Sequence, residues 1–238
     1  MKLHGMASYM RGWAEKASDV SPMELVGLLS DAEWTYRENK RMASRLQHAK
    51  LRQVACIEDI DFAHARGLQK SQVMDLATSR WVAEKQNIIL TGPTGVGKSF
   101  IACALGQKAC RDGFAVVYRR TSRLFDELAQ ARVDGTHGNA LKRLAKAQVL
   151  ILDDFGLEAM SAPERKELLE VLEDRYQLAS TVVTSQLEPK DWHAVIGDAT
   201  LADAILDRLV HNAHRIKLGG DSIRKADANL TAHKKQAK

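Results

Sequence analysis

Hydrophobic runs in the second part of the chain alternate with longer stretches of helical pattern. The runs, rich in β-branched residues, are 88–90, 115–118, 149–152, 181–184 and 215–218. As a group they lack the regular apolar–polar alternation of strands that have one face in water, so we expect both faces to be buried. Buried strands separated by helices predict an α/β fold, a three-layer αβα sandwich with a five-stranded parallel sheet.

The first 65 residues have a helical pattern instead. Ser21 is a suitable N-cap and Pro22 suits the first helical position, so one helix is expected to begin there. A second helical run is expected from about Asp31 to Val54. The pattern predicts a small helical N-terminal domain with a linker over 1–65, a main α/β domain over 66–225, and a basic tail over 226–238.

Two shorter signals lie inside the main domain. Gly113 is expected to end the helix that follows the first strand. Ser161, followed by Pro163 and then Glu164 three residues on, has the spacing of a capping box and predicts another helix start.

Composition limits the class of protein. The 238 residues, 45% of them hydrophobic, suffice for one large domain or a main domain with a small appendage. No apolar run has the length of a bilayer span, and the first 16 residues lack the apolar core of a signal peptide. Three scattered cysteines do not suggest a disulfide framework. We therefore expect a cytoplasmic protein with no membrane partner.

Charge is distributed unevenly along the chain. The formal net charge is +5. Residues 37–52 contain six basic side chains and one acidic one, and residues 224–238 contain five basic and one acidic. The remainder is mildly acidic. Basic extensions on an acidic body suggest a polyanionic partner.

The strongest chemical signal directly follows the first predicted strand. It matches the phosphate-binding pattern G-x-x-x-x-G-K-[ST] with Gly92, Pro93, Thr94, Gly95, Val96, Gly97, Lys98 and Ser99, and Phe100 continues into a helix. Glycines let backbone amides turn inward around phosphates, and the helix adds the positive end of its dipole. The lysine would reach the phosphates and Ser99 would bind Mg²⁺. A glycine-rich turn with a chance lysine is the alternative.

Carboxylates follow the third predicted strand, and hydroxyls follow the fourth. Asp153 is the better candidate for the metal shell, and Asp154 is the candidate catalytic base or water-orienting group, unless it only caps a helix or turn. Ser185 and Thr184 are both candidates for a polar group between the attacking water and the γ phosphate, although strand-end capping would explain them too.

Together with the Asp207-Arg208-Leu209 box, these motifs resemble the DnaC/IstB group of AAA+ ATPases. Segments 201–225 and 45–62 resemble IstB, the ATP-binding helper of an insertion-sequence transposase. The resemblance implies ATP and Mg²⁺ as cofactors, a homo-oligomer on duplex DNA, and help to a cognate transposase in choosing its target. It implies that Arg208 is an arginine finger acting on a neighbouring subunit, and that Arg224 is a second nucleotide sensor.

Two departures from the wider family stand out. Asp154 occupies a position where most AAA+ proteins have glutamate, which suggests slow hydrolysis. No long helical pattern follows residue 218, so the C-terminal lid is expected to be truncated or absent.

Basic residues on the first domain are candidates for DNA contact. Arg37, Arg41, Arg45 and Arg52 recur at helical spacing, with His48 between the last two. Such a stripe suits phosphate backbones without reading base sequence, although a solvated amphipathic helix or a partner-binding helix would have the same pattern. Further DNA-binding candidates in the main domain are Arg119, Arg120, Lys142 and Arg143.

Three alternative functions share the nucleotide motif. A DnaC-like replicative helicase loader would have all of these residues and would differ in its protein partner. A small-molecule kinase would need an acceptor pocket and a lid bearing arginine, neither of which the pattern locates. A nucleotide-dependent scaffold would need ATP binding but not hydrolysis.

Overall fold

The computed structural model describes residues 2–13 and 20–222. Contacts within the chain group it into two compact units, Met1–Gln47 and His48–Lys238. The boundary precedes the expected one at residue 65, because residues 48–65 contribute buried Ala49, Ala55, Ile57 and Ile60 to the second unit. The tail 226–238 and any lid beyond residue 222 lie outside the described residues.

The first unit contains two helices, α1 (His4–Trp13) and most of α2 (Pro22–Ala49). They pack closely at Gly5, where an added Cβ would lie 2.5 Å from the carbonyl oxygen of Ala32. The carboxylate of Glu33 on α2 accepts a hydrogen bond of 2.7 Å from the amide of Gly5. A carboxylate at the amino end of α1 satisfies an amide that the helix itself leaves unpaired.

The expectation of two separate helical runs between Pro22 and Val54 was wrong, because α2 is continuous. At Ser30 the hydroxyl donates to the carbonyl of Val26 one turn earlier, so this polar residue is accommodated inside the helix. The helix ends at Ala49, and Lys50 has a positive φ of 50°.

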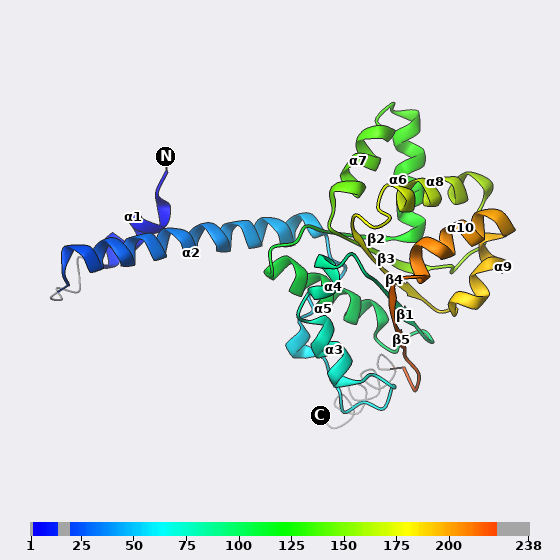
Figure 1. The fold of residues 1–238 in the computed structure, drawn as a ribbon, viewed down its shortest axis with the longest axis horizontal. Coiled ribbons are helices and arrows are strands. Elements are labelled where there is room, and N and C mark those ends of the chain that lie inside the picture. The colour runs from blue at the N-terminus through cyan, green and yellow to red at the C-terminus, as the bar shows by residue number, and fades with distance from the viewer. Residues whose placement is uncertain (1, 14–19, 223–238) are drawn as a thin grey trace, which may run out of the picture. The chain divides into compact units, whose positions relative to one another are not determined.

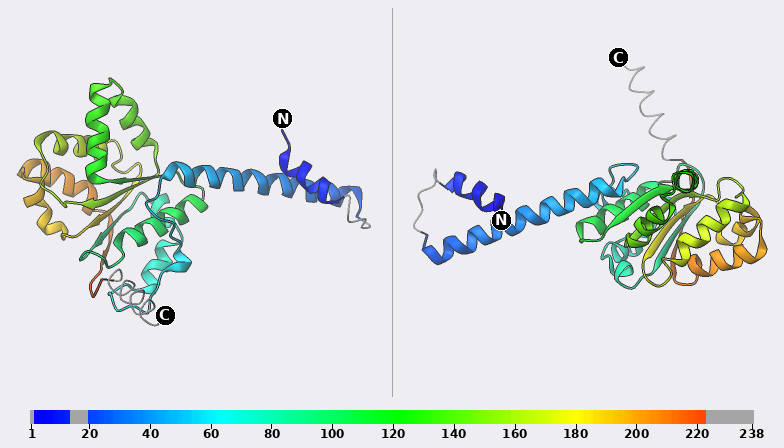
Figure 2. Two further views of the ribbon diagram at one scale, coloured as in Figure 1. Left: turned by 180° about the vertical axis from the view of Figure 1, so that it is seen from behind. Right: turned by 90° about the horizontal axis from the view of Figure 1, so that it is seen from above.

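The second unit is built on a five-stranded parallel sheet in the order β2-β3-β4-β1-β5 (Figures 1 and 2). The strands are β1 (Asn87–Thr91), β2 (Val116–Arg120), β3 (Val149–Phe155), β4 (Ser180–Ser185) and β5 (Ala213–Lys217). All five sequence-predicted runs therefore form strands. The α/β prediction is confirmed, and the strand ends differ from the prediction by a few residues.

Helices cover both faces of this sheet (Figure 2). The α-helices of the second unit that follow α2 are α3 (Lys70–Leu76), α4 (Arg80–Ala83), α5 (Lys98–Arg111), α6 (Thr121–Val133), α7 (His137–Lys146), α8 (Ala162–Glu173), α9 (Trp192–Ile196) and α10 (Ala199–Val210). Two short 3₁₀ helices are Ile57–Asp59 and Pro189–Asp191. Helix α8 begins at the predicted capping box, where Glu164 accepts a 2.6 Å hydrogen bond from the amide of Ser161.

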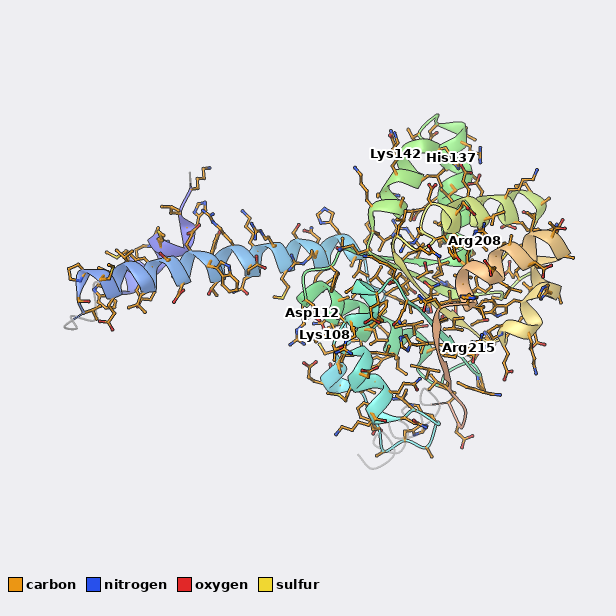
Figure 3. All side chains as sticks on the ribbon, in the orientation of Figure 1. Lys108, Asp112, His137, Lys142, Arg208 and Arg215 are labelled. Carbon is orange, nitrogen blue, oxygen red and sulfur yellow. The ribbon has the colours of Figure 1, made fainter. Side chains whose placement is uncertain are left out.

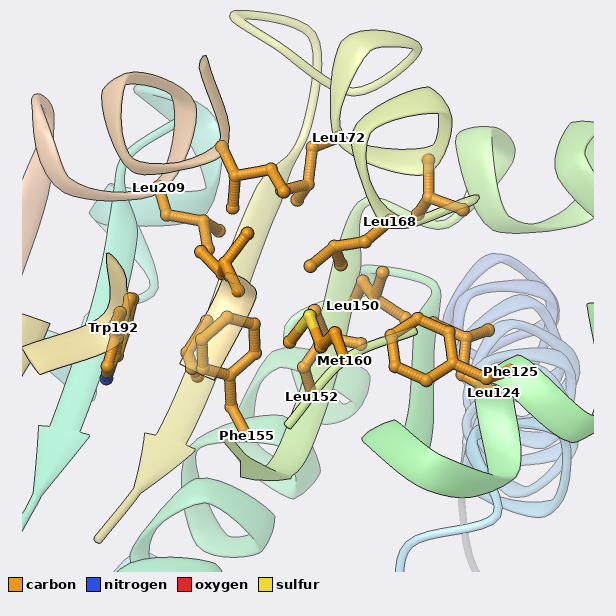
Figure 4. Close-up of a cluster of buried hydrophobic side chains, with 14 of the residues drawn as sticks. Leu124, Phe125, Leu150, Leu152, Phe155, Met160, Leu168, Leu172, Trp192 and Leu209 are labelled. Carbon is orange, nitrogen blue, oxygen red and sulfur yellow. The ribbon is translucent and has the colours of Figure 1, made fainter. Parts of the chain in front are cut away.

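Alternate residues of the central strands enter separate cores. Leu150 and Leu152 of β3 pack with Phe155, Trp192 and other side chains from α6 to α10 (Figure 4). On the other face, α5 lies so close that a Cβ on Gly106 would be 2.7 Å from Cδ1 of Ile151. The α5 cysteines Cys103 and Cys110 are fully buried. Among the described helices, none combines the length and apolar character that crossing a membrane requires.

The order of the strands brings the chemically interesting segments together. The carboxyl ends of β3 and β4 lie next to each other, and β4 adjoins β1, after which the glycine-rich loop begins. Pairing between β3 and β4 is irregular between Leu152 and Phe155, so Asp153 and Asp154 lie at a local distortion of the strand.

Candidate nucleotide-binding site

The glycine-rich loop adopts a conformation that its glycines permit. Gly92, Gly95 and Gly97 have φ values of 143°, 90° and 94°. A Cβ would lie 2.1 Å from the Leu218 carbonyl oxygen if added to Gly92, and 2.1 Å from the Ser222 hydroxyl if added to Gly95. The loop therefore lies tightly beneath residues 218–222. It leads directly into the amino end of α5, a favourable place for an anion.

Lys98 and Ser99, the first two residues of α5, have well-defined partners. The buried ammonium of Lys98 donates to the carbonyls of Gly92 and Pro93 at 2.7 and 2.8 Å. The hydroxyl of Ser99 donates to Oδ1 of Asp153 at 2.7 Å. The loop thus holds a cation and a hydroxyl beside a carboxylate, as the sequence motif predicts.

Asp153 is fully buried and surrounded by donors. Its Oδ1 accepts from Ser99 and from Thr184 at 2.5 Å, and its Oδ2 accepts from the Tyr118 hydroxyl at 2.5 Å and from Arg52 at 3.1 Å. Burial acts to raise the pKa of Asp153, but hydrogen bonds from Thr184, Tyr118, Ser99 and Arg52 outweigh it and lower the pKa below its usual range. The carboxylate is therefore held as an anion.

Asp154 is partly exposed, in contrast to its neighbour Asp153. Its φ is 58°, and its amide donates to the Thr184 hydroxyl at 3.1 Å. Its carboxylate pairs with Arg120 at 3.1 Å and with Arg52 at 3.5 Å. The two carboxylates therefore share Arg52 as a partner but differ in exposure, because Asp153 is fully buried and Asp154 is partly open to solvent.

A cavity of about 520 Å³ opens above these residues. Its lining includes six predicted loop and helix residues, Thr94, Gly95, Gly97, Lys98, Ser99 and Phe100. It also includes Asp154, and residues that were predicted elsewhere or not at all: Arg52, Gln53, Asp59, Asp61, Arg66, Arg120, Leu157 and Gln186. Gly92, Pro93 and Val96 shape the loop without lining the cavity.

Arg66 is the site residue that sequence reasoning missed most clearly. It is 3% exposed, and its two terminal nitrogens donate to the carbonyls of Val96 and Asp61 at 3.1 and 2.8 Å. Its Nε has no partner among the described residues. A buried guanidinium with an unmet donor, beside the glycine loop that leads into α5, fits a phosphate-bearing ligand. No local motif marks Arg66, since only folding brings it to the loop.

The structure does not place Ser185 in the cavity. Its buried hydroxyl donates to the carbonyl of Phe155 at 2.8 Å and accepts from the amide of Leu187 at 3.1 Å, which is the strand-end bonding weighed as the alternative. Thr184 bonds to Asp153 instead, and Gln186 lines the cavity.

Arg208 lies near the amino end of β1, whereas the loop follows its carboxyl end. Its carbonyl accepts from the side chain of Asn87, the first residue of β1, whereas the loop follows the last. One strand length of about 13 Å therefore separates it from its own loop. Its side chain pairs with Glu173 and lies 5.7 Å from the ring of Tyr176. The other predicted sensor, Arg224, lies outside the described residues.

The candidate DNA-binding residues on α2 have different surroundings. Arg37 pairs with buried Glu33 at 2.7 Å, and Arg41 pairs with Glu38 at 2.6 Å. Arg45 lies 4.0 Å from Glu38. Arg52 does not continue this stripe, because α2 ends at Ala49 and the side chain of Arg52 enters the cavity.

The main-domain candidates also separate. Arg119 is buried and pairs with Glu127 at 2.9 Å, and Arg120 is at the cavity. Arg143 lies 3.6 Å from Glu127, whereas Lys142 is exposed on α7 (Figure 3). Of these four, Lys142 and Arg143 remain on an open surface.

Comparison with known protein families matches residues 1–231 to the IstB-like ATP binding protein family. The chain belongs to this family. It is 50% identical over 210 residues to a Sinorhizobium fredii (strain NBRC 101917 / NGR234) protein named as an insertion sequence ATP-binding protein, covering 88% of this chain and 86% of the relative. The predicted resemblance to IstB is therefore confirmed.

Solved structures support the same fold for the IstB-like chain. DnaI is similar with a TM-score of 0.60 and 22% identity, covering 74% of this chain and 93% of DnaI. DnaA from Aquifex aeolicus, bound to AMPPCP, is similar with a TM-score of 0.62 and 17% identity, covering 72% and 52% of the two chains. At these identities the likeness shows the fold alone, which is the AAA+ P-loop fold.

Proposed function

We propose that this IstB-like protein is a cytoplasmic ATPase that binds Mg²⁺ and ATP in the cavity, assembles on duplex DNA, and helps a cognate transposase engage its target. The observation that carries the nucleotide assignment is the combination of the glycine loop, Lys98 and the Ser99–Asp153 pair at one cavity. The relative in Sinorhizobium fredii, named for an insertion sequence, supports the transposition context.

Different residues of the cavity would bind different parts of the nucleotide and its metal ion. Loop amides and Lys98 would bind the phosphates, and Ser99 with Asp153 would hold the metal ion. A bound Mg²⁺ would neutralise charge that develops on the phosphates. Asp154 would orient the attacking water, a role supported by its position in the lining of the cavity. Gln186 takes the place proposed for Ser185 as the polar residue near that water.

Charge balance in the cavity favours an arginine from a second subunit. Four cationic side chains (Arg52, Arg66, Lys98 and Arg120) face four carboxylates (Asp59, Asp61, Asp153 and Asp154). These eight side chains together carry no net formal charge, and Mg²⁺ with ATP would add net negative charge. Arg208 lies near the amino end of β1, away from its own cavity. It would therefore contact the nucleotide of a neighbouring copy in a homo-oligomer.

The arginine finger is tested by Arg208→Ala. We expect single subunits to bind nucleotide as the unchanged protein does, while hydrolysis in the assembled state falls by about a thousandfold, the lower range for such arginines. Normal turnover by the assembled variant would exclude this role. Because Arg208 also pairs with Glu173, thermal unfolding of the variant is the control for folding.

DNA contact is proposed to be directed to phosphates. Arg41 and Arg45 on α2 are the strongest candidates, with Lys142 and Arg143 on α7. Arg41 pairs with Glu38, and Arg143 lies near Glu127; both carboxylates are partly exposed, so phosphates can replace them at little cost.

Particle imaging tests the whole proposal. The protein with duplex DNA should form ordered assemblies when ATP is added and should not do so without nucleotide. ATP turnover should require Mg²⁺ and rise with DNA. Assemblies that form equally well without nucleotide, or a failure to bind DNA, would contradict the proposal.

A DnaC-like helicase loader is the second candidate. It is favoured by the similarity to DnaI and to the DnaC helicase loader, the latter with a TM-score of 0.56 and 22% identity over 69% of this chain and 96% of that one. Co-purification separates the two, since a transposase should be retained in one case and a replicative helicase in the other.

A further inference from the structure

Arg52 occupies a place that its sequence position did not suggest. It follows the end of α2 by three residues, yet its guanidinium reaches across to the carboxylates beneath the glycine loop. Nη1 lies 3.1 Å from Oδ2 of Asp153 and 3.5 Å from Oδ2 of Asp154. The Arg52 side chain is 39% exposed, whereas that of Asp153 is fully buried. A solvent-accessible cation thus covers a buried anion.

The backbone that carries Arg52 is held against the helix after the loop. Ala49 and Ala55, on either side of it, are fully buried. Leu51 packs on α5, since a Cβ on Gly106 would lie 3.3 Å from its Cδ2. Arg52 therefore reaches the carboxylate from a segment that packs against α5.

The hydrogen-bonding pattern of Asp153 shows what Arg52 does there. Oδ1 is occupied by Ser99 and Thr184, and Oδ2 is shared by Tyr118 and Arg52. The first three donors are neutral hydroxyls, whereas Arg52 brings a full positive charge to the carboxylate. A divalent cation that uses the same carboxylate would meet that positive charge at close range.

We propose that Arg52 is a positioning residue that neutralises Asp153 when no metal is present and leaves it when Mg²⁺ and nucleotide bind, which presupposes the metal–nucleotide site proposed above. Arg52 and Mg²⁺ are both positively charged and compete for the Asp153 carboxylate. The Arg52 contact therefore weakens metal binding, and metal binding releases Arg52. Residues 50–56, the covalent connection that follows α2, would then change their mobility with the nucleotide state.

The competition is tested by Mn²⁺ binding, measured by electron paramagnetic resonance in the presence of a non-hydrolysable ATP analogue. Arg52→Gln should bind Mn²⁺ about five- to tenfold more tightly than the unchanged protein, a range set by one partly exposed ion pair. Arg52→Lys should stay near the unchanged protein because it retains the charge. Arg123→Gln, which removes a guanidinium that pairs with Asp126 outside the cavity, should have no effect.

Hydrogen exchange over residues 50–56 provides a second readout. In the unchanged protein, exchange should rise when Mg²⁺ and the analogue are added. In Arg52→Gln it should be high without them, and Arg52→Lys should restore most of the protection.

Equal or weaker Mn²⁺ binding by Arg52→Gln would overturn this role, and weaker analogue binding without metal would assign Arg52 to the phosphates instead. If the unchanged protein bound the analogue but no Mn²⁺, the metal site itself would be wrong. That result is distinguishable from a failure confined to Arg52.

Discussion

Replacing Asp153 with asparagine tests whether the buried carboxylate stabilises the fold as an anion. The shape is retained, but one acceptor oxygen becomes an NH₂ donor. If that donor faces Tyr118 and Arg52, the tyrosine hydroxyl can turn to accept, whereas Arg52 has no acceptor to offer. Hydrogen bonds to a charged group contribute about 1.5–3 kcal/mol each, so losing the charge should lower the unfolding free energy by about 3–4 kcal/mol.

Urea unfolding followed by circular dichroism at pH 7 measures this change. The dependence on urea should be the same for both proteins, since the surface exposed on unfolding does not change. Asp126→Asn is the matched control, because that side chain is 70% exposed and lies 3.6 Å from Arg123. The control should change stability by less than about 0.5 kcal/mol.

The pH dependence gives the sign of the effect. The pKa of Asp153 is lower in the folded protein than the value of about 4 in an unfolded chain. Its contribution is therefore complete above the unfolded-state pKa and is lost as pH falls through the folded-state pKa. The stability difference between the unchanged protein and Asp153→Asn should narrow as pH is lowered below about 4. A deficit under about 1 kcal/mol at pH 7, or one that widens in acid, would refute a charged Asp153.

Three further experiments test the glycine loop and the proposed DNA contacts. Lys98→Ala should weaken ATP binding by about 2–3 kcal/mol, roughly 30- to 150-fold, in a fluorescent-nucleotide titration, and undiminished affinity would contradict the phosphate assignment. Charge reversal at Arg41 and Arg45 should weaken duplex binding and reduce its salt slope by about 2, whereas unchanged affinity would make the stripe a solvated face. Gly92→Ala should destabilise the protein by at least about 2 kcal/mol more than Gly113→Ala in thermal unfolding, because both glycines have positive φ but an added Cβ at Gly113 meets no atom within 4 Å. Equal losses would mean that Leu218 moves aside freely.

Features that depend only on residues close together in the sequence could be predicted from the sequence alone. The five strands follow from short apolar runs, and the capping box at Ser161 follows from a spacing of three residues. The glycine loop follows from a pattern eight residues long, whose positive φ angles only glycine adopts readily. Apolar pattern and backbone sterics act over short stretches of chain. The sequence alone therefore predicts the parallel sheet and the place of Lys98 at the start of a helix.

The partners of the arginines were decided only by the tertiary structure. A helical wheel cannot show that α2 ends at Ala49, after which Arg52 reaches Asp153, 101 residues away in the chain. Arg66 similarly reaches Val96 across 30 residues. A long charged side chain can reach water, a partner or a buried anion from the same sequence position, and its partner is chosen by which distant segments folding brings within about 3 Å.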